Sequence, residues 1–356
     1  MKKIISATLA LLMTVSVFTA CSKKEEDKND KQSNTAVTKF EEAKLGDGIV
    51  ATVNDMEISV EEFKFYLAQY CETLYSQNGM YEASKTEKEA FWANSGDKSM
   101  KESFYDSALT GYVGLASMVN LAMEKGLSVT DEEVTAELSA EGMSDAIEHY
   151  KTSYGITEDA IFEYMKKQMI YEKYAVEYIE KDERMEISDE DINKYFGENY
   201  IKAQHILKMT VNQETNEPLS EEEKNAVYKS AEEVLASVKK DGADFKAIML
   251  EQSEDPGSQS QPDGYVFTEG EMVTEFYEGA KALKENEISD IIETSYGYHI
   301  IKRLPLDTDV DLANMKDQIT SGLEQKAFQE ILEEAKKQMT VKADYNQLYA
   351  IEGILY

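Results

Sequence analysis

The chain has 356 residues, and its 70 Asp and Glu against 37 Lys and Arg leave a formal net charge of −33 at pH 7. This charge disfavours nucleic acid as a partner, because such binding depends on Lys and Arg neutralising phosphates. With 42% hydrophobic residues the chain can build packed cores, and its length fits about two domains. Two Cys and three His are too few for a disulfide framework or a zinc site. We therefore expect no metal.

Residues 1–20 have the composition of a secretory signal rather than of a folded element. Lys2 and Lys3 precede an apolar run over residues 4–18, and two small residues and Cys21 follow it. The run is shorter than the about 20 apolar residues of a transmembrane helix, and charged residues come directly after Cys21. A signal peptide over residues 1–20 is therefore predicted.

Cys21 lies at a position that resembles the modified cysteine of the bacterial lipobox, although Phe18 stands where the lipobox usually has Leu. A plain signal peptide followed by an incidental cysteine is the alternative interpretation. Diacylglycerol on the Cys21 thiol would hold the mature chain on a membrane without a spanning helix, because each buried CH₂ contributes roughly 0.8 kcal/mol. We expect residues 21–47 to form a lipidated flexible tether.

Helical periodicity dominates the two flanks of the chain. Apolar residues at steps of three and four form a long stripe over residues 104–122, and further stripes cover 157–179 and 312–331. Stripes of this kind are more typical of a core face than of a binding surface. The pattern predicts one mostly helical body that is built from residues 48–198 and 306–356.

Local signals add a helix start and two strand segments to this body. Ser59 and Glu62 have the spacing of a capping box. Residues 49–58 alternate like a β-hairpin with an Asn-Asp turn, and residues 339–343 alternate like a single strand. Pairing of that strand with the hairpin would close the two flanks into one domain.

The segment 199–305 differs from the flanks in composition and in period. It contains all four prolines and two of the three histidines. Strands are predicted over 201–209 and 298–303, and helices over 220–239 and 245–250. These elements make a compact α+β domain inserted into the helical body, so the fold class predicted for the chain is α+β.

Two histidines lie within alternating strands near the opposite ends of this segment. His205 belongs to the first strand and His299 to the last. If the two strands are neighbours, the imidazoles face each other on one side of the sheet. The alternative is two unrelated, half-buried histidines that are satisfied by backbone carbonyls. The spacing by itself leaves both interpretations open.

Over its whole length the segment resembles the parvulin-type peptidyl-prolyl isomerases. The matching stretches are, in chain order, residues 203–207, 242–245, 252–256, 271–276, 282–289 and 294–301. This resemblance implies three catalytic residues, namely His205, Asp255 and His299. It also implies a proline pocket with a supporting hydrogen-bond network, formed by Met272, Phe276, Phe267 and Thr294.

The segment departs from the parvulin pattern at one turn. The family has a glycine-rich turn before the central Phe, and this chain has Pro262-Asp263-Gly264-Tyr265-Val266 there. The resemblance therefore does not determine the shape of this pocket wall. No Arg or Lys cluster follows His205 beyond Lys208, which disfavours phosphorylated substrates, because a phosphate needs paired cations.

The signal sequence, the helical flanks and the inserted domain together resemble the PrsA-type foldase lipoproteins of Gram-positive bacteria, and less closely the SurA-type chaperones. This resemblance implies an isomerase without a cofactor, anchored by lipid on the extracytoplasmic face of the cell membrane. Its partners would be unfolded or partly folded secreted proteins with X-Pro bonds. A holdase-type chaperone lipoprotein with an inactive isomerase domain is the main alternative, and a solute-binding lipoprotein is a third. The identity of the clients and the existence of a homodimer stay open.

Overall fold

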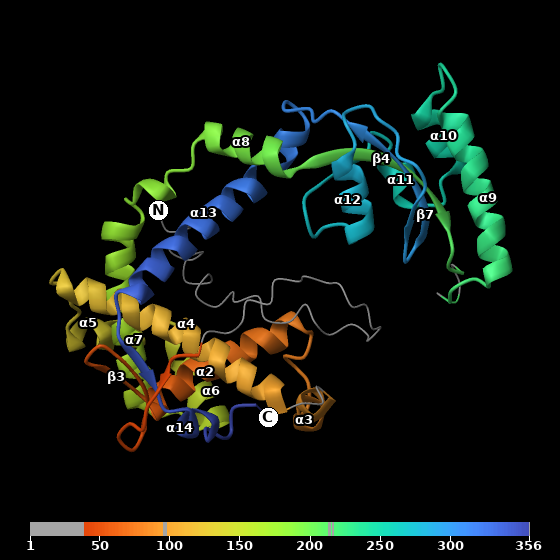
Figure 1. The fold of residues 1–356 in the computed structure, drawn as a ribbon. Helices are drawn as coiled ribbons and strands as arrows, with labels where there is room; N and C mark the ends of the chain where they lie inside the picture. Colours follow the sequence, from red (N-terminus) through yellow and green to blue (C-terminus); the bar gives the residue numbers. More distant parts are fainter. Residues whose placement is uncertain (1–38, 95–97, 213–214, 216, 356) are drawn as a thin grey trace. The chain divides into compact units, whose positions relative to one another are not determined.

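The chain divides into two compact units, which Figure 1 shows in the colours of the sequence. The computed structural model describes residues 39–94, 98–212, 215 and 217–355. Unit 1 holds the described residues up to Glu186 and those from Glu324 onward, and unit 2 is Ile187–Leu323. The predicted signal peptide and Cys21 lie outside the described residues. Within the described ranges, no helix is long and apolar enough to cross a membrane.

Unit 1 is mostly helical and contains one small sheet. Its helices are α2 (Val60–Gln77), α3 (Lys85–Asn94), α4 (Lys98–Glu124), α5 (Asp131–Leu138), α6 (Met143–Tyr154), α7 (Glu158–Tyr174), the π-helical turn η1 (Ala175–Ile179), the 3-10 turn η2 (Glu183–Met185), the C-terminal part of α13 (Asp311–Lys337) and α14 (Tyr345–Tyr349). Its strands are β1 (Glu41–Glu42), β2 (Ile49–Val53), β3 (Met56–Ser59) and β8 (Val341–Ala343). The long helices predicted from the apolar stripes are confirmed.

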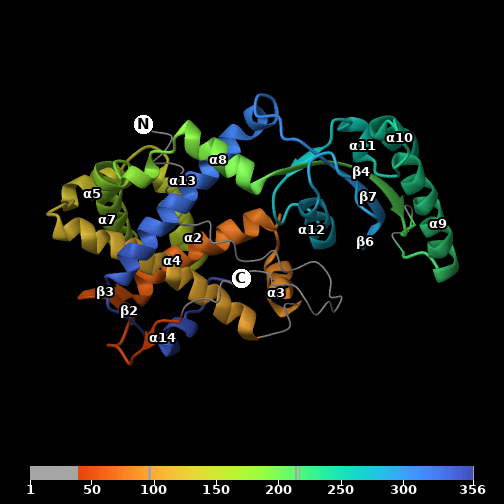
Figure 2. The same cartoon turned by 45° about the horizontal axis from the view of Figure 1, so that its top comes forward.

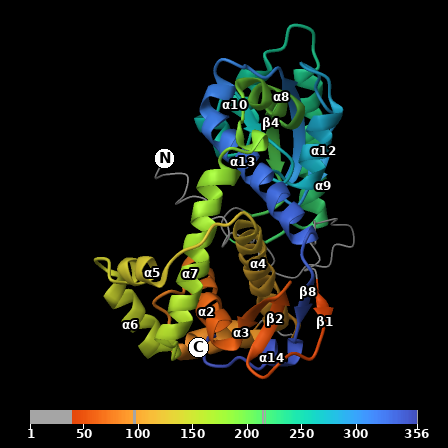
Figure 3. The ribbon, with the colours of Figure 1, turned by 90° about the vertical axis from the view of Figure 1, so that its left-hand side faces the viewer.

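The sheet of unit 1 brings the two flanks of the chain together. Its strand order is β1-β8-β2-β3, and Figure 3 shows β8 between β1 and β2. The predicted hairpin is confirmed, since β2 and β3 are antiparallel and Asn54 in their turn has a φ of 54°. The predicted pairing of the C-terminal strand is also confirmed, because β8 is antiparallel to β2 with Ala51 opposite Ala343.

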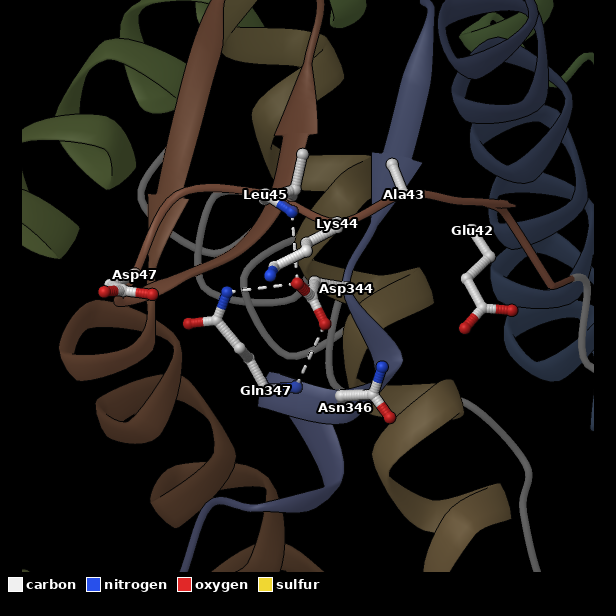
Figure 4. A pocket seen from close by; sticks show the side chains of 8 residues that line it. All are labelled: Glu42, Ala43, Lys44, Leu45, Asp47, Asp344, Asn346 and Gln347. Atoms are coloured by element: carbon white, nitrogen blue, oxygen red, sulfur yellow. Dashed lines mark hydrogen bonds between the residues drawn. The ribbon is translucent and has the colours of Figure 1, made fainter.

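The C-terminal end of the expected tether 21–47 is part of this sheet, which corrects that expectation. Glu41 and Glu42 pair in parallel with β8, whose edge would otherwise leave its backbone groups unpaired. Asp344 holds the segment after β1 in place, because it accepts hydrogen bonds from the backbone of Leu45 and from Gln347 (Figure 4). These residues belong to the lining of a pocket formed by Glu42, Ala43, Lys44, Leu45, Asp47, Asp344, Asn346 and Gln347.

The core of unit 1 contains a buried charge that replaces the predicted capping box. The Ser59 hydroxyl does accept a hydrogen bond from the Glu62 backbone, at 3.1 Å. The Glu62 carboxylate, however, points into the core, where it accepts from the hydroxyl of Tyr112 and the ammonium of Lys167. Only 3% of Glu62 is exposed, so its charge needs these partners more than the helix terminus needs a cap.

Unit 2 consists of a four-stranded sheet with helices on both faces. Its strands, in the order β5-β4-β7-β6, are β5 (Tyr265–Phe267), β4 (Ile201–Met209), β7 (Gly297–Leu304) and β6 (Ile292–Thr294). Its helices are α8 (Asp189–Asn199), α9 (Glu221–Val238), α10 (Phe245–Gln252), α11 (Gly257–Ser260), α12 (Thr274–Ala282) and the first part of α13. The predicted α+β fold class is confirmed.

Side chains alternate along β4 and β7, so each face of the sheet packs against different helices. Ile206 and Ile300 point to one face and pack against α9 and α10. Ile201 and Ile301 point to the other face and pack with Phe276 of α12. Figure 2 shows α12 on one side of β4 and β7 and α9 on the other.

A separate helical cluster supports one edge of this sheet. Apolar residues of α8 and α13 pack together with Val266 of β5. Lys202 of β4 forms a partly buried ion pair with Asp311 at the start of α13, with 2.9 Å between Nζ and Oδ1. Unit 2 therefore includes α8 and the first part of α13 in addition to residues 199–305.

We expect Glu62→Ala to lower the free energy of unfolding of unit 1 by about 3 kcal/mol, because the largely shielded Lys167 ammonium would lose its carboxylate partner. Trp92, the only tryptophan, is buried in unit 1, so its fluorescence during urea denaturation reports this transition. The double variant Glu62→Met/Lys167→Met should recover most of the loss.

Glu89→Ala is the matched control, since Glu89 forms an exposed ion pair with Lys85 and should cost at most about 0.5 kcal/mol. Equal losses for Glu62→Ala and Glu89→Ala would contradict a stabilising role of the buried charge.

Candidate active site

Two neighbouring strands bring the predicted histidines together. In the antiparallel β4–β7 pair, His205 is opposite Ile301 and Leu207 is opposite His299. The two histidines therefore lie diagonally on the same face of the sheet, the one that α12 covers. Their Nδ1 atoms are 3.1 Å apart and their rings are stacked. Of the two interpretations left open by the spacing, the structure shows the facing pair.

The imidazoles are the middle of a continuous row of hydrogen bonds. His205 Nε2 lies 2.9 Å from Asp255 Oδ2, and His299 Nε2 lies 2.9 Å from Thr294 Oγ1. Both histidines and Thr294 are buried. Four of the residues that the sequence predicts thus come together from β4, β6, β7 and the loop after α10.

Asp255 is the most densely bonded group of the site. Its Oδ2 atom accepts from His205 Nε2, from the Tyr265 hydroxyl at 2.6 Å and from the Ser258 hydroxyl at 3.1 Å. Its Oδ1 atom accepts from the Gly257 backbone at 3.2 Å. Four donors on one carboxylate stabilise its charged form.

The protonation states follow from these contacts. Burial alone would raise the pKa of Asp255, but the hydrogen bonds from His205 and Tyr265 hold it well below its usual range. Burial, together with the nearby His205, lowers the pKa of His299 to about 3. Burial and the bond to Asp255 raise the pKa of the Tyr265 hydroxyl. At neutral pH the site therefore holds a carboxylate, a neutral His299 and a neutral phenol.

Only two proton arrangements satisfy this row. Asp255 can only accept, so His205 carries a proton on Nε2. With His205 neutral, its Nδ1 accepts from His299 Nδ1, and His299 Nε2 accepts from the Thr294 hydroxyl. With His205 protonated, its Nδ1 donates to His299 Nδ1, and His299 Nε2 donates to Thr294. One proton on His205 therefore reverses the direction of the two bonds beyond it.

The histidines form one wall of a cavity of about 430 Å³. The residues that line it are His205, Leu207, Met209, Asp255, Pro256, Tyr265, Glu271, Met272, Val273, Phe276, Tyr296 and His299. Met272 and Phe276, both predicted for the proline pocket, belong to this lining. The Phe276 ring contacts the rings of both histidines edge-on, with centroids 5.1 and 5.3 Å away. The cavity thus combines an apolar wall with a polar one.

Two predicted residues lie behind this lining rather than in it. Phe267 is buried against Phe276, with ring centroids 5.7 Å apart. Thr294 lies behind His299, in the hydrogen-bond row. Sequence reasoning missed Tyr265, which both lines the cavity and binds Asp255. The signal was available, since alternation along β5 places Tyr265 on the same face as Phe267.

We expect the His299 ring to stay neutral until the pH falls to about 3, and the imidazole resonances of the full chain will test this. The His299→Asn and His149→Gln variants identify the signals. An unfolded His299 would take up its proton near 6.5, so unfolding binds a proton between that pH and about 3. Stability of unit 2 is therefore fully present above pH 6.5 and falls as the pH drops through this window. A His299 ring that titrates near 6.5 would contradict the assignment.

The segment that contains this site is similar to a known protein family. The family model "Rotamase: PPIC-type PPIASE domain" matches residues 205–304. The foldase protein PrsA of Geobacillus kaustophilus is 35% identical over 232 residues, which cover 62% of this chain and 72% of that protein. The PrsA protein of Caldanaerobacter subterraneus is 28% identical over 309 residues, which cover 85% of this chain and 82% of that protein.

Solved structures of related proteins were also found. A crystal structure of the peptidylprolyl isomerase PrsA from Bacillus cereus shares 26% identity and covers 68% of this chain and 83% of its own, with a TM-score of 0.35. On the identity and coverage of the Geobacillus relative, this chain belongs to the PrsA family of foldases and carries a peptidyl-prolyl isomerase domain of the parvulin type.

Proposed function

We propose that this foldase isomerises X-Pro bonds of secreted proteins in the cavity between His205, His299 and α12, while a lipid on Cys21 holds it at the extracytoplasmic face of the membrane. His205, Asp255 and His299 are the catalytic residues in this proposal, and Met272 and Phe276 hold the proline ring. The observation that carries it is the row of hydrogen bonds from Asp255 to Thr294 along one wall of an otherwise largely apolar cavity.

The chemistry needs placement rather than bond cleavage. Rotation about a prolyl peptide bond is opposed by amide resonance, with a barrier of roughly 20 kcal/mol. A planar amide is more dipolar than a twisted one, so a site that excludes water favours the twisted transition state. Met272 and Phe276 provide the apolar surface for this, and no cofactor or nucleophile takes part.

The polar wall of the cavity faces the carbonyl group that rotates during isomerisation. In the neutral arrangement, the ring edges of His205 and His299 are held in place by Asp255 at one end and Thr294 at the other. The rotating carbonyl therefore meets fixed dipoles instead of mobile water, which lowers the cost of reorganisation during the turn.

Substrates of this site are expected to be unphosphorylated. Among the described residues that line the cavity there is no Lys or Arg, and Glu271 adds a carboxylate. A phosphate would thus meet negative charge without a compensating cation.

We expect Asp255→Ala to lower kcat/KM for a proline peptide by about tenfold or more, because His205 would lose the acceptor that fixes its Nε2 proton. Exchange spectroscopy on the cis and trans peptide signals measures the rate without a coupling enzyme. Circular dichroism should show unchanged helix and strand content.

Lys239→Ala is the control for this experiment, since it breaks only an exposed ion pair with Asp290 in the same unit. Unchanged activity in Asp255→Ala would overturn the assignment of the site. A wild-type chain that delays client aggregation but does not turn over the peptide would favour the holdase alternative.

The anchoring part of the proposal is supported by the position of Cys21 after the apolar run. We expect Cys21→Ala to move the protein from the membrane fraction to the soluble fraction, because one acylated cysteine would be its anchor. Cys71→Ala is the matched control, since Cys71 is buried in α2 and its loss should leave the distribution unchanged. Retention of Cys21→Ala in the membrane fraction would contradict lipid anchoring.

A further inference from the structure

Tyr265 occupies the turn at which this chain departs from the glycine-rich parvulin pattern, and its side chain reaches the centre of the site. Its hydroxyl donates to Asp255 Oδ2 at 2.6 Å, which is shorter than the 2.9 Å between His205 Nε2 and the same oxygen. Its ring meets the His205 ring edge-on, with centroids 5.6 Å apart. Tyr265 therefore contacts both members of the Asp255–His205 pair.

Gly257 leaves the space that the Tyr265 hydroxyl occupies beside Asp255. A Cβ atom on Gly257 would lie 1.9 Å from the Tyr265 oxygen, so only glycine at this position leaves room for it. The backbone N–H of Gly257 donates to the other carboxylate oxygen, Asp255 Oδ1. The start of α11 and strand β5 thus meet at one carboxylate.

The backbone of β5 is fixed from two directions. Tyr265 pairs with Ala203 of β4. The preceding Gly264 has a φ of 95°, and a Cβ atom on it would lie 2.7 Å from the Ala203 carbonyl oxygen. On the other face of β5, Val266 packs into the helical cluster of α8 and α13. The position of the Tyr265 ring is therefore set by the fold and does not depend on a substrate.

We propose that Tyr265 is a positioning residue of the isomerase, whose hydroxyl fixes the Asp255 carboxylate so that His205 keeps its proton on Nε2 and turns Nδ1 toward His299. This inference rests on the proposed site. Oδ2 of Asp255 shares three donors, and removing the shortest of these bonds lets the carboxylate turn away from His205. The charged form of Asp255 also loses a donor, which favours protonation at low pH.

The other groups around Asp255 do not replace this contact. His205 from β4 and Ser258 from α11 already use the same oxygen, and His299 from β7 reaches Asp255 only through His205. From α12 the site receives the Phe276 ring, which has no polar atom. Loss of the Tyr265 hydroxyl therefore leaves Oδ2 with two donors.

The test is Tyr265→Phe in the full chain, with exchange spectroscopy on a proline peptide across a range of pH. We expect kcat/KM near neutral pH to fall by about fivefold, and the acid-side loss of activity to begin about one pH unit higher than in the wild type. KM should change little, because the ring still lines the cavity. Tyr228→Phe is the matched control, since it removes an exposed phenol of α9 in the same unit and should leave the profile unchanged.

A second variant reaches the same contact from the other side. Gly257→Ala keeps Tyr265 but places a methyl group where its hydroxyl lies, so it should produce the same acid-side shift. In the double variant with Tyr265→Phe, the two losses should be less than additive, because both act on one hydrogen bond.

The outcomes separate this inference from the proposed function. An active Asp255→Ala variant would overturn the proposed site and this inference with it. Loss of activity in Asp255→Ala, together with a wild-type pH profile in Tyr265→Phe, would overturn only the role of Tyr265. A uniform loss at all pH values in Tyr265→Phe, with unchanged His205 imidazole resonances, would also overturn it.

Discussion

The isomerase unit depends on one partly buried negative charge. Asp255 can stay ionised at the cavity wall only because four donors converge on it, and these donors come from β4, β5 and the start of α11. Each of these elements must therefore be in its place before the carboxylate is satisfied. The bond from His205 to Asp255 also keeps a proton on His205 Nε2, so that Nδ1 faces His299. The contacts that hold these elements together are thus the same contacts that set the charge and the proton positions of the site.

The sheet determines which side chains face the cavity. Because side chains alternate along β4 and β7, one face carries the histidines and the other carries Ile206 and Ile300, which bury themselves under α9 and α10. A shift of one residue in this register would place the imidazoles under the helices and the isoleucines in the cavity. The Phe276 ring of α12 then packs edge-on against both histidine rings.

Unit 1 also contains a charge that is stabilised by partners from several elements, but this charge holds helices together. Glu62 is buried where α2, α7 and α4 meet, and it contacts Tyr112 and the partly buried Lys167 there. Such a pair fixes the relative position of three helices, since moving any one of them would leave a charge without its partner. The sheet formed by β1, β8, β2 and β3 then ties the beginning of the described chain to its end.

The sequence by itself determined the elements whose causes are local. Periods of two and of 3.6 residues identified β4, β7 and the long helices, and the Asn54 turn identified the hairpin. The order of matching segments also pointed to His205, Asp255 and His299. Tertiary structure decided what depends on residues far apart in the chain. The Glu62 carboxylate contacts Lys167 and does not cap its helix. Residues 41–42 pair with β8 and are not part of a tether, and Tyr265 donates to Asp255. In each case a wholly or partly buried charge or an open strand edge needed a partner, and only the folded chain brings that partner close.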